Sequence, residues 1–199
     1  MNVKGLKISD ILDMDLDTFN RLNESELRAV TSRLVSAGNK RIRRLQSHNI
    51  NSPAVQGLGT KGSFSTKVVT AKGNQTNKLR EEFARARSFL TSETSTITGY
   101  KKYVAKTYER LSSEMNLPLE KIKKQLDVNK LFEIHHKLQS KGLISSYAHS
   151  KGSLQARDTI AEMLINNPNL SYDEIETWYE QNYEDINADE TNETEETEI

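Results

Sequence analysis

Two stretches of the sequence carry side chains that could act on a nucleic acid. The first is GNKRIRRL at residues 38–45, where Lys40, Arg41, Arg43 and Arg44 close a long helical pattern. Guanidinium and ammonium groups in such a run are typical of surfaces that contact phosphates. A solvated helix face also accounts for these residues, so the run alone leaves both interpretations open.

Cations recur on two later helical patterns. The further candidate DNA-binding residues are Lys78, Arg80, Arg85, Arg87, Lys101, Lys102 and Lys106. Tyr100, Tyr103 and Tyr108 interleave with the last three, and aromatic rings among cations can stack on the bases of a strand. A helix pair that packs these tyrosines into a small core is the interpretation we favour.

The second stretch is LISSYAHSKGS at residues 143–153, a hydroxyl-rich loop between two helical patterns. Its candidate nucleophile is Ser150, with Ser146, Tyr147 and Ser153 as rivals. The sequence assembles no base and orienting group around these hydroxyls, so an acceptor role would depend on metal ions supplied by a partner. An interhelical turn uses Ser and Gly for its own geometry, and that alternative stays open.

A metal site or an independent active centre is not expected. His135 and His136 are adjacent on a helical pattern, so their side chains project about 100° apart and cannot both face one ion. The chain has no Cys, which excludes disulfides, thiolate catalysis and thiolate metal ligands. We therefore expect a binding or acceptor protein, with no cofactor of its own, rather than an enzyme.

Charge is sorted along the chain although its formal sum is zero. Residues 38–151 hold 22 Lys and Arg against eight Asp and Glu, whereas residues 171–199 hold 12 acids and no base. This asymmetry is typical of a basic body that meets nucleic acid and an acidic tail. No apolar run reaches about 18 residues, so neither a membrane span nor a membrane partner is expected.

Apolar spacing near 3.6 residues predicts an all-α protein, elongated and with a thin core. We expect N-terminal helices in 1–45, interrupted at Gly38, and a flexible basic linker at 46–73 with a brief β-like stretch at 64–70. An intermediate helical pair follows in 74–117 and a C-terminal helical subdomain in 118–186, where Ser171 and Glu174 form a capping box. Residues 187–199 are acidic and are expected to be disordered.

This order of a basic helical part, a helical pair and a helix–loop–helix with a Ser-rich loop resembles the terminal proteins of small podophages of Gram-positive bacteria. The stretch that carries the resemblance is LFEIHHKLQSKGLISSYAHSKGSLQARDTIAEML. Members of that family prime replication of linear DNA by accepting the first nucleotide on a loop hydroxyl. The chain is short for the family, and its acidic tail departs from the family's pattern.

The resemblance implies a DNA-binding phage replication protein whose partners are DNA and a family B DNA polymerase. The polymerase would supply the divalent metal, and Ser150 best matches the acceptor. The protein would act in the host cytoplasm or nucleoid and be carried on genome ends in the virion. Its oligomeric state stays open. The alternatives are a helical virion or scaffolding protein and a non-specific DNA-binding protein, with 118–142 as the one candidate helix-turn-helix.

Overall fold

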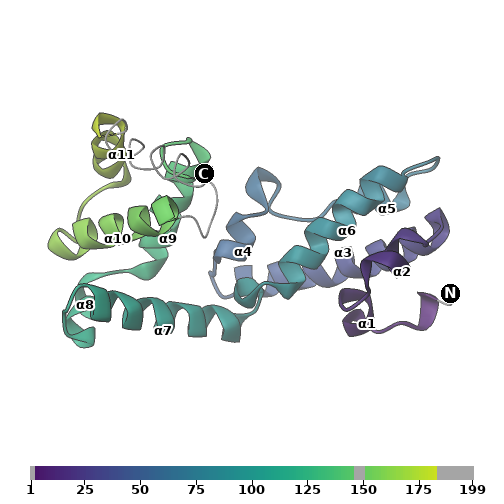
Figure 1. The fold of residues 1–199 in the computed structure, drawn as a ribbon, viewed down its shortest axis with the longest axis horizontal. Coiled ribbons are helices and arrows are strands. Elements are labelled where there is room, and N and C mark those ends of the chain that lie inside the picture. The colour runs from purple at the N-terminus through teal and green to yellow at the C-terminus, as the bar shows by residue number, and fades with distance from the viewer. Residues whose placement is uncertain (1–2, 146–150, 183–199) are drawn as a thin grey trace, which may run out of the picture. The chain divides into compact units, whose positions relative to one another are not determined.

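The computed structural model describes residues 3–145 and 151–182, and every regular element within these ranges is a helix (Figure 1). The all-α prediction is confirmed. The chain forms two compact units, unit 1 from Met1 to Tyr103 and unit 2 from Val104 to Ile199. The boundary lies inside helix α7 (Ile97–Glu114), whereas the sequence predicts the nearest limit between residues 117 and 118.

Unit 1 begins with two short helices, α1 (Ile8–Leu12) and α2 (Leu16–Asn20). The long helix α3 (Glu24–Gln46) follows. The Asn23 side chain accepts from the N–H of Glu26 at 2.9 Å, and the Glu26 carboxylate accepts from the N–H of Asn23 at 3.1 Å. This reciprocal cap satisfies two of the N–H groups that a helix start leaves unpaired. It explains why α3 begins directly after Asn23.

Helices α3 and α6 (Thr76–Thr91) lie side by side and form the centre of unit 1 (Figure 1). The Thr31 hydroxyl of α3 donates a hydrogen bond to the Leu79 carbonyl of α6. Ten residues further along α3, Arg41 donates to the Leu90 carbonyl, which lies eleven residues further along α6. The two helices therefore run in the same direction. Because α3 is roughly 34 Å long at 1.5 Å per residue, the chain between them must return along the pair.

That return path is residues 46–73, and it corrects the prediction of a flexible linker. The segment contains α4 (Pro53–Gln56), a 3₁₀ turn at Gly59–Lys61 and α5 (Thr66–Thr70). Helix α5 replaces the β-like stretch that we expected there. Val55, Phe64 and Val69 are buried, and one Arg28 guanidinium nitrogen donates to the carbonyls of Val69 and Ala71 at 3.0 and 2.8 Å. The segment is thus part of the unit 1 core.

The sequence predicts a helix interruption at Gly38, but α3 continues through this residue. A Cβ at this position would lie 2.6 Å from the Phe64 ring, which packs edge-on against Phe89 at 5.6 Å between ring centroids. Glycine is needed because an aromatic ring from the return path approaches the helix backbone. The sequence pattern locates the glycine, but not the distant side chain that fills its space.

Unit 2 contains the second part of α7 together with α8 (Leu119–Gln125), α9 (Val128–Ser140), α10 (Lys151–Asn166) and α11 (Tyr172–Gln181). The expected capping box is confirmed, since the Glu174 carboxylate accepts from the N–H of Ser171 at 2.7 Å. Gly142 follows α9 with φ +74°, as expected for a residue just past a helix end. Leu154 of α10 is 38% exposed. The acidic segment 187–199 lies outside the described residues.

Candidate functional site

The four cations of GNKRIRRL divide into two groups in the structure. Lys40, Arg43 and Arg44 are exposed near the end of α3. Arg41 is partly buried, and one of its guanidinium nitrogens donates to the Leu90 carbonyl at 2.7 Å and to Ser95 Oγ at 3.0 Å. Arg41 therefore joins the end of α6 to the turn that follows it. The other three cations can meet an external anion.

A small cleft of about 130 Å³ adjoins this cationic end. It is lined by Arg41, Arg44 and Leu45 of α3 and by the residues Ser95, Thr96, Ile97 and Thr98. Thr96 precedes α7, and its hydroxyl accepts from the N–H of Gly99 at 3.0 Å. The cleft thus combines guanidinium groups, hydroxyls and the N-terminus of an 18-residue helix, all of which favour an anion.

The turn before α7 packs so closely against the first turn of this helix that only glycine fits at position 99. A Cβ on Gly99 would collide with the carbonyl oxygen of Glu93. Ser95 is buried, and Thr94, also buried, accepts from the N–H of Ala54 at 3.1 Å. These contacts fix the hydroxyl-bearing turn on the return path and on α3. In the sequence, residues 94–99 indicate only a break within the helical pair of 74–117, and no local pattern reveals this turn.

The candidate cations of α6 have varied surroundings. Arg85 pairs with the buried Glu82 at 3.0 Å and lies over the Phe64 ring. Arg80 lies over the Phe19 ring, and its Nε is buried without a hydrogen-bond partner in the described part of the chain. Arg87 is half-buried and Lys78 is exposed. Arg80 and Arg85 thus take part in packing, whereas Lys78 is the exposed one of these four cations.

Lys101, Lys102 and Lys106 are exposed on α7, as a phosphate-contacting role requires. The tyrosines between them face protein instead. Tyr100 is buried, Tyr103 is half-buried, and the hydroxyl of Tyr108 donates to the Leu126 carbonyl at 3.0 Å. These contacts agree with the core interpretation that we favoured for the aromatic residues.

Of the four candidate acceptor hydroxyls, only Ser153 falls within the described residues; Ser146, Tyr147 and Ser150 lie outside them. Ser153 is fully buried. Its Oγ lies 3.2 Å from His135 Nε2 and 3.4 Å from Gln139 Nε2. A hydroxyl without solvent exposure cannot meet a nucleotide in this conformation, so the structure argues against Ser153 as the acceptor.

His135 and Gln139 of α9 connect the two described ends that flank residues 146–150. The Nε2 of His135 donates to the Ser153 carbonyl at 3.0 Å, because a carbonyl can only accept, and Gln139 donates to the Ser145 carbonyl at 2.9 Å. Burial and, to a smaller extent, the charge of nearby Arg157 together lower the pKa of His135 to about 4. His135 is therefore neutral near pH 7. It holds the start of α10 as a structural hydrogen-bond donor.

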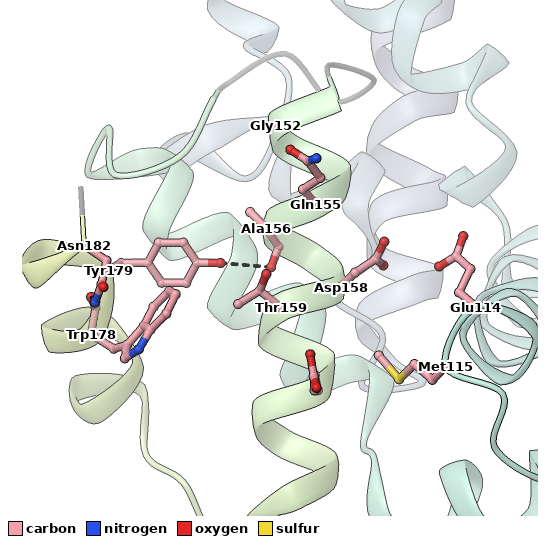
Figure 2. A pocket seen from close by; sticks show the side chains of 11 residues that line it. Glu114, Met115, Gly152, Gln155, Ala156, Asp158, Thr159, Trp178, Tyr179 and Asn182 are labelled. Atoms are coloured by element: carbon pink, nitrogen blue, oxygen red, sulfur yellow. Dashed lines mark hydrogen bonds between the residues drawn. The ribbon is translucent and has the colours of Figure 1, made fainter. Parts of the chain in front are cut away.

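A larger cleft of about 680 Å³ lies in unit 2 beside α10 (Figure 2). Asp158 projects from α10 toward Glu114 of α7, and Glu162 also lines the cleft. Arg110 donates to both oxygens of Asp158, at 3.0 and 2.6 Å, and pairs with Glu114. These carboxylates raise the pKa of Arg110, which stays charged. Three carboxylates outweigh one guanidinium, so the cleft repels phosphate.

Helix α11 forms the other wall of this cleft. Trp178 and the buried Tyr179 line it, and the Tyr179 hydroxyl donates to the Ala156 carbonyl at 3.1 Å (Figure 2). Burial raises the pKa of Tyr179 above its usual range, so this hydroxyl keeps its proton. Lys141, the residue that caps the end of α9, pairs with Glu176 of α11. Helix α11 is thus anchored to α10 through Tyr179 and to the end of α9 through Glu176.

The described residues contain no group of three or more His, Asp or Glu arranged to hold a metal ion. His135 is buried and His136 is half-buried, which places the two rings in different surroundings. No described helix is both long and apolar enough to cross a membrane. Comparison with protein-family models, curated proteins and solved structures returns no match.

Proposed function

We propose that the chain binds DNA through unit 1 and serves as a protein primer that accepts the first nucleotide on a loop hydroxyl. The observation that carries the DNA-binding part is the exposed end of α3. There Lys40, Arg43 and Arg44 adjoin the hydroxyl-lined cleft at the start of α7. Ammonium and guanidinium groups, hydroxyls and helix N-termini are the groups that proteins use on DNA phosphates.

The charge of unit 1 supports binding without base preference. Unit 1 holds 18 Lys and Arg against nine Asp and Glu. Exposed cations release counterions from the phosphate backbone, and this gain does not depend on sequence. The α8–α9 segment does not change this view. It is the segment that we named as the helix-turn-helix candidate, but the Asn129 side chain near the start of α9 is already bonded to Asp127 at 3.2 Å.

The acceptor part rests on the family resemblance and on the surroundings of the loop. Unit 2 holds ten Lys and Arg against 19 Asp and Glu, and an acidic body can enter a polymerase channel built for a duplex. Gly152 lines the acidic cleft beside the start of α10. With Ser153 buried, the candidates are Ser146, Tyr147 and Ser150, and we retain Ser150.

The proposed reaction is a phosphoryl transfer. The hydroxyl oxygen of Ser150 attacks the α-phosphorus of a deoxynucleoside triphosphate, an oxygen–phosphorus bond to the protein forms, and pyrophosphate leaves. The hydroxyl proton passes to solvent through the polymerase site. Divalent ions of the partner polymerase would lower the pKa of the hydroxyl and neutralise the leaving group. This chain supplies the acceptor and its placement.

DNA binding is tested by competition between unrelated duplexes. Changing Lys40, Arg43 and Arg44 together to Ala should weaken binding to every duplex by the same factor, because only phosphate contacts are lost. The control is Arg85→Ala, which removes a cation already paired with Glu82. An equal loss of affinity in the control, or a loss confined to one duplex, would contradict the assignment.

The acceptor is tested with a family B polymerase, a divalent metal and a labelled deoxynucleoside triphosphate, followed by mapping of the adduct by mass spectrometry. Ser150→Ala should abolish labelling, whereas Ser153→Ala should keep it. Label on Ser146 or Tyr147 would move the acceptor within the loop. If an active polymerase transfers no label to the chain, priming is rejected and only the DNA-binding function remains proposed.

A further inference from the structure

Unit 2 contains a second cleft whose lining has the opposite charge to that of Figure 2. It measures about 370 Å³ and lies where α8 turns into α9, with Tyr108 of α7 and the end of α10 as further walls. Lys123, Lys124 and Lys130 line it. The unit as a whole is acidic, so three lysines around one hollow form a local basic site.

One carboxylate also lines this cleft, and it is held by the local backbone. Asp127 caps α9, and its Oδ1 accepts from the N–H of Asn129 at 2.8 Å and from the Asn129 side chain at 3.2 Å. These bonds satisfy that oxygen without a lysine. Three ammonium groups therefore face one carboxylate that is already hydrogen-bonded, and the lining keeps a net positive charge.

The three ammonium groups keep donors for a ligand. Lys130 donates one hydrogen bond to the Pro168 carbonyl at 3.0 Å, which leaves two of its three N–H groups. Lys123 pairs with Glu120 at 3.1 Å, but the two side chains are 45% and 84% exposed. Ion pairs so open to solvent are weak and exchange readily with another anion. Lys124 is exposed at the same edge.

The wall of the cleft is fixed, and it contains an unsatisfied polar group. The Tyr108 hydroxyl donates to the Leu126 carbonyl at 3.0 Å and holds the α8–α9 turn on α7. Gln125 lines the cleft, and its Oε1 is buried with no hydrogen-bond partner in the described part of the chain. Buried amide oxygens normally have a donor. The amide nitrogen at the other end of this side chain is the group from which a ligand oxygen in the cleft can accept a hydrogen bond.

We propose that this cleft binds a phosphate group of a nucleotide, either free or within a strand. Three lysine ammonium groups and an amide that can present an N–H match the tetrahedral set of oxygen acceptors on a phosphate. The cleft of Figure 2 in the same unit has no lysine among the described residues that line it. The inference concerns residues 108–130 and 168 and does not depend on DNA binding by unit 1 or on the acceptor loop.

The site is tested by nuclear magnetic resonance on the isotope-labelled full chain, titrated separately with pyrophosphate, dTTP and a short single-stranded oligothymidylate. We expect saturable shifts of the backbone amides of residues 125–129 and of the Gln125 side-chain amide. Lys124→Ala combined with Lys130→Ala should raise the dissociation constant at these signals about tenfold or more, since two charge-assisted contacts are lost. Lys121→Ala changes a lysine of α8 that does not line the cleft and should leave the constant within about twofold.

The three ligands separate the sources of the phosphate. Shifts with dTTP and pyrophosphate identify a free nucleotide, and shifts with the oligonucleotide alone identify a strand; either result supports the site. No saturable shift in residues 125–129 with any ligand would overturn it. So would equal weakening by Lys121→Ala, because the binding would then reflect the general charge of α8. Loss of unit 1 binding in the Lys40, Arg43 and Arg44 variant should not change these signals.

Discussion

Units 1 and 2 are both helical, yet they use their charged residues in opposite ways. In unit 1 Lys and Arg outnumber Asp and Glu, but several arginines take part in packing. Arg28 and Arg41 donate to backbone carbonyls, and Arg85 pairs with a buried carboxylate. In unit 2 the surplus is negative, and Arg110 and Lys141 pair with carboxylates that join helices. Net charge therefore distinguishes the two units, but only the contacts show which cations are engaged in packing.

The largest effect should come from Phe64, which belongs to the return path of unit 1. Phe64→Ala should lower the free energy of unfolding by about 3–5 kcal/mol, since it opens a cavity between Gly38 and Phe89. Urea unfolding followed by circular dichroism measures this. Leu16→Ala is the control, because Leu16 is 69% exposed and its loss should cost under about 0.5 kcal/mol. A neutral Phe64→Ala would restore the linker interpretation of residues 46–73.

Unit 2 should be the pH-sensitive unit because of His135. The pKa of His135 is about 4 in the folded chain against an ordinary value of 6.5. Between pH 4 and pH 6.5 the unfolded chain therefore carries a proton on this ring that the folded chain does not. Stability should therefore fall as pH drops from 6.5 toward 4, by about 2–3 kcal/mol in all. Unfolding can be followed by fluorescence of Trp178, the single Trp of the chain.

The matched variants for this prediction are His135→Gln and His136→Gln. The first should remove most of the pH dependence in that window, and the second should retain most of it because His136 is less buried. An unchanged pH profile in His135→Gln would show that other groups cause the acid destabilisation.

A smaller effect should separate Arg41 from Arg43, two arginines of the same run. Arg41→Met removes hydrogen bonds to Leu90 and Ser95 and should lower the free energy of unfolding by about 1–2 kcal/mol. Arg43→Met should change it by under about 0.5 kcal/mol, because Arg43 is exposed. Thermal unfolding of both variants tests this difference. Equal losses would erase the division between structural and phosphate-facing cations.

The smallest predicted effect concerns the start of α3. Asn23→Ala removes the cap on Glu26 and should cost about 1 kcal/mol. Ser36→Ala, at an exposed position inside the same helix, should be neutral or slightly stabilising because Ala favours helices. Denaturant midpoints compare the two. A neutral Asn23→Ala would mean that packing against α6 alone sets the start of α3.

The sequence predicted what depends on local chemistry. The all-α class and the capping box of Ser171 and Glu174 follow from residue types at fixed spacing. The return path could not be predicted, because Gly, Ser and Asn in 46–73 indicate turns locally and do not reveal that α3 and α6 run parallel. Gly38 was misread as a helix break for the same reason, since Phe64 is distant in sequence.

The candidate sites show the same limit. The run 38–45 was found from its cations, but the contacts of Arg41 with Leu90 and Ser95 could not be predicted, because they depend on the packing of α3 against α6. Likewise, Ser153 looked equivalent to the other loop hydroxyls until the position of His135 placed it inside unit 2. In the sequence, Lys123 and Lys124 indicate only a charged helix. They line one cleft with Lys130 because the chain turns after Leu126.

The salt dependence of DNA binding tests the central claim most directly. The affinity of the wild-type chain for a random duplex should fall linearly with salt on logarithmic axes. In the Lys40, Arg43 and Arg44 to Ala variant the slope should be shallower by about 2–3, because each lost phosphate contact removes about 0.9 from it. An affinity and slope equal to those of the wild type would contradict the assignment of the α3 end as the DNA-binding surface.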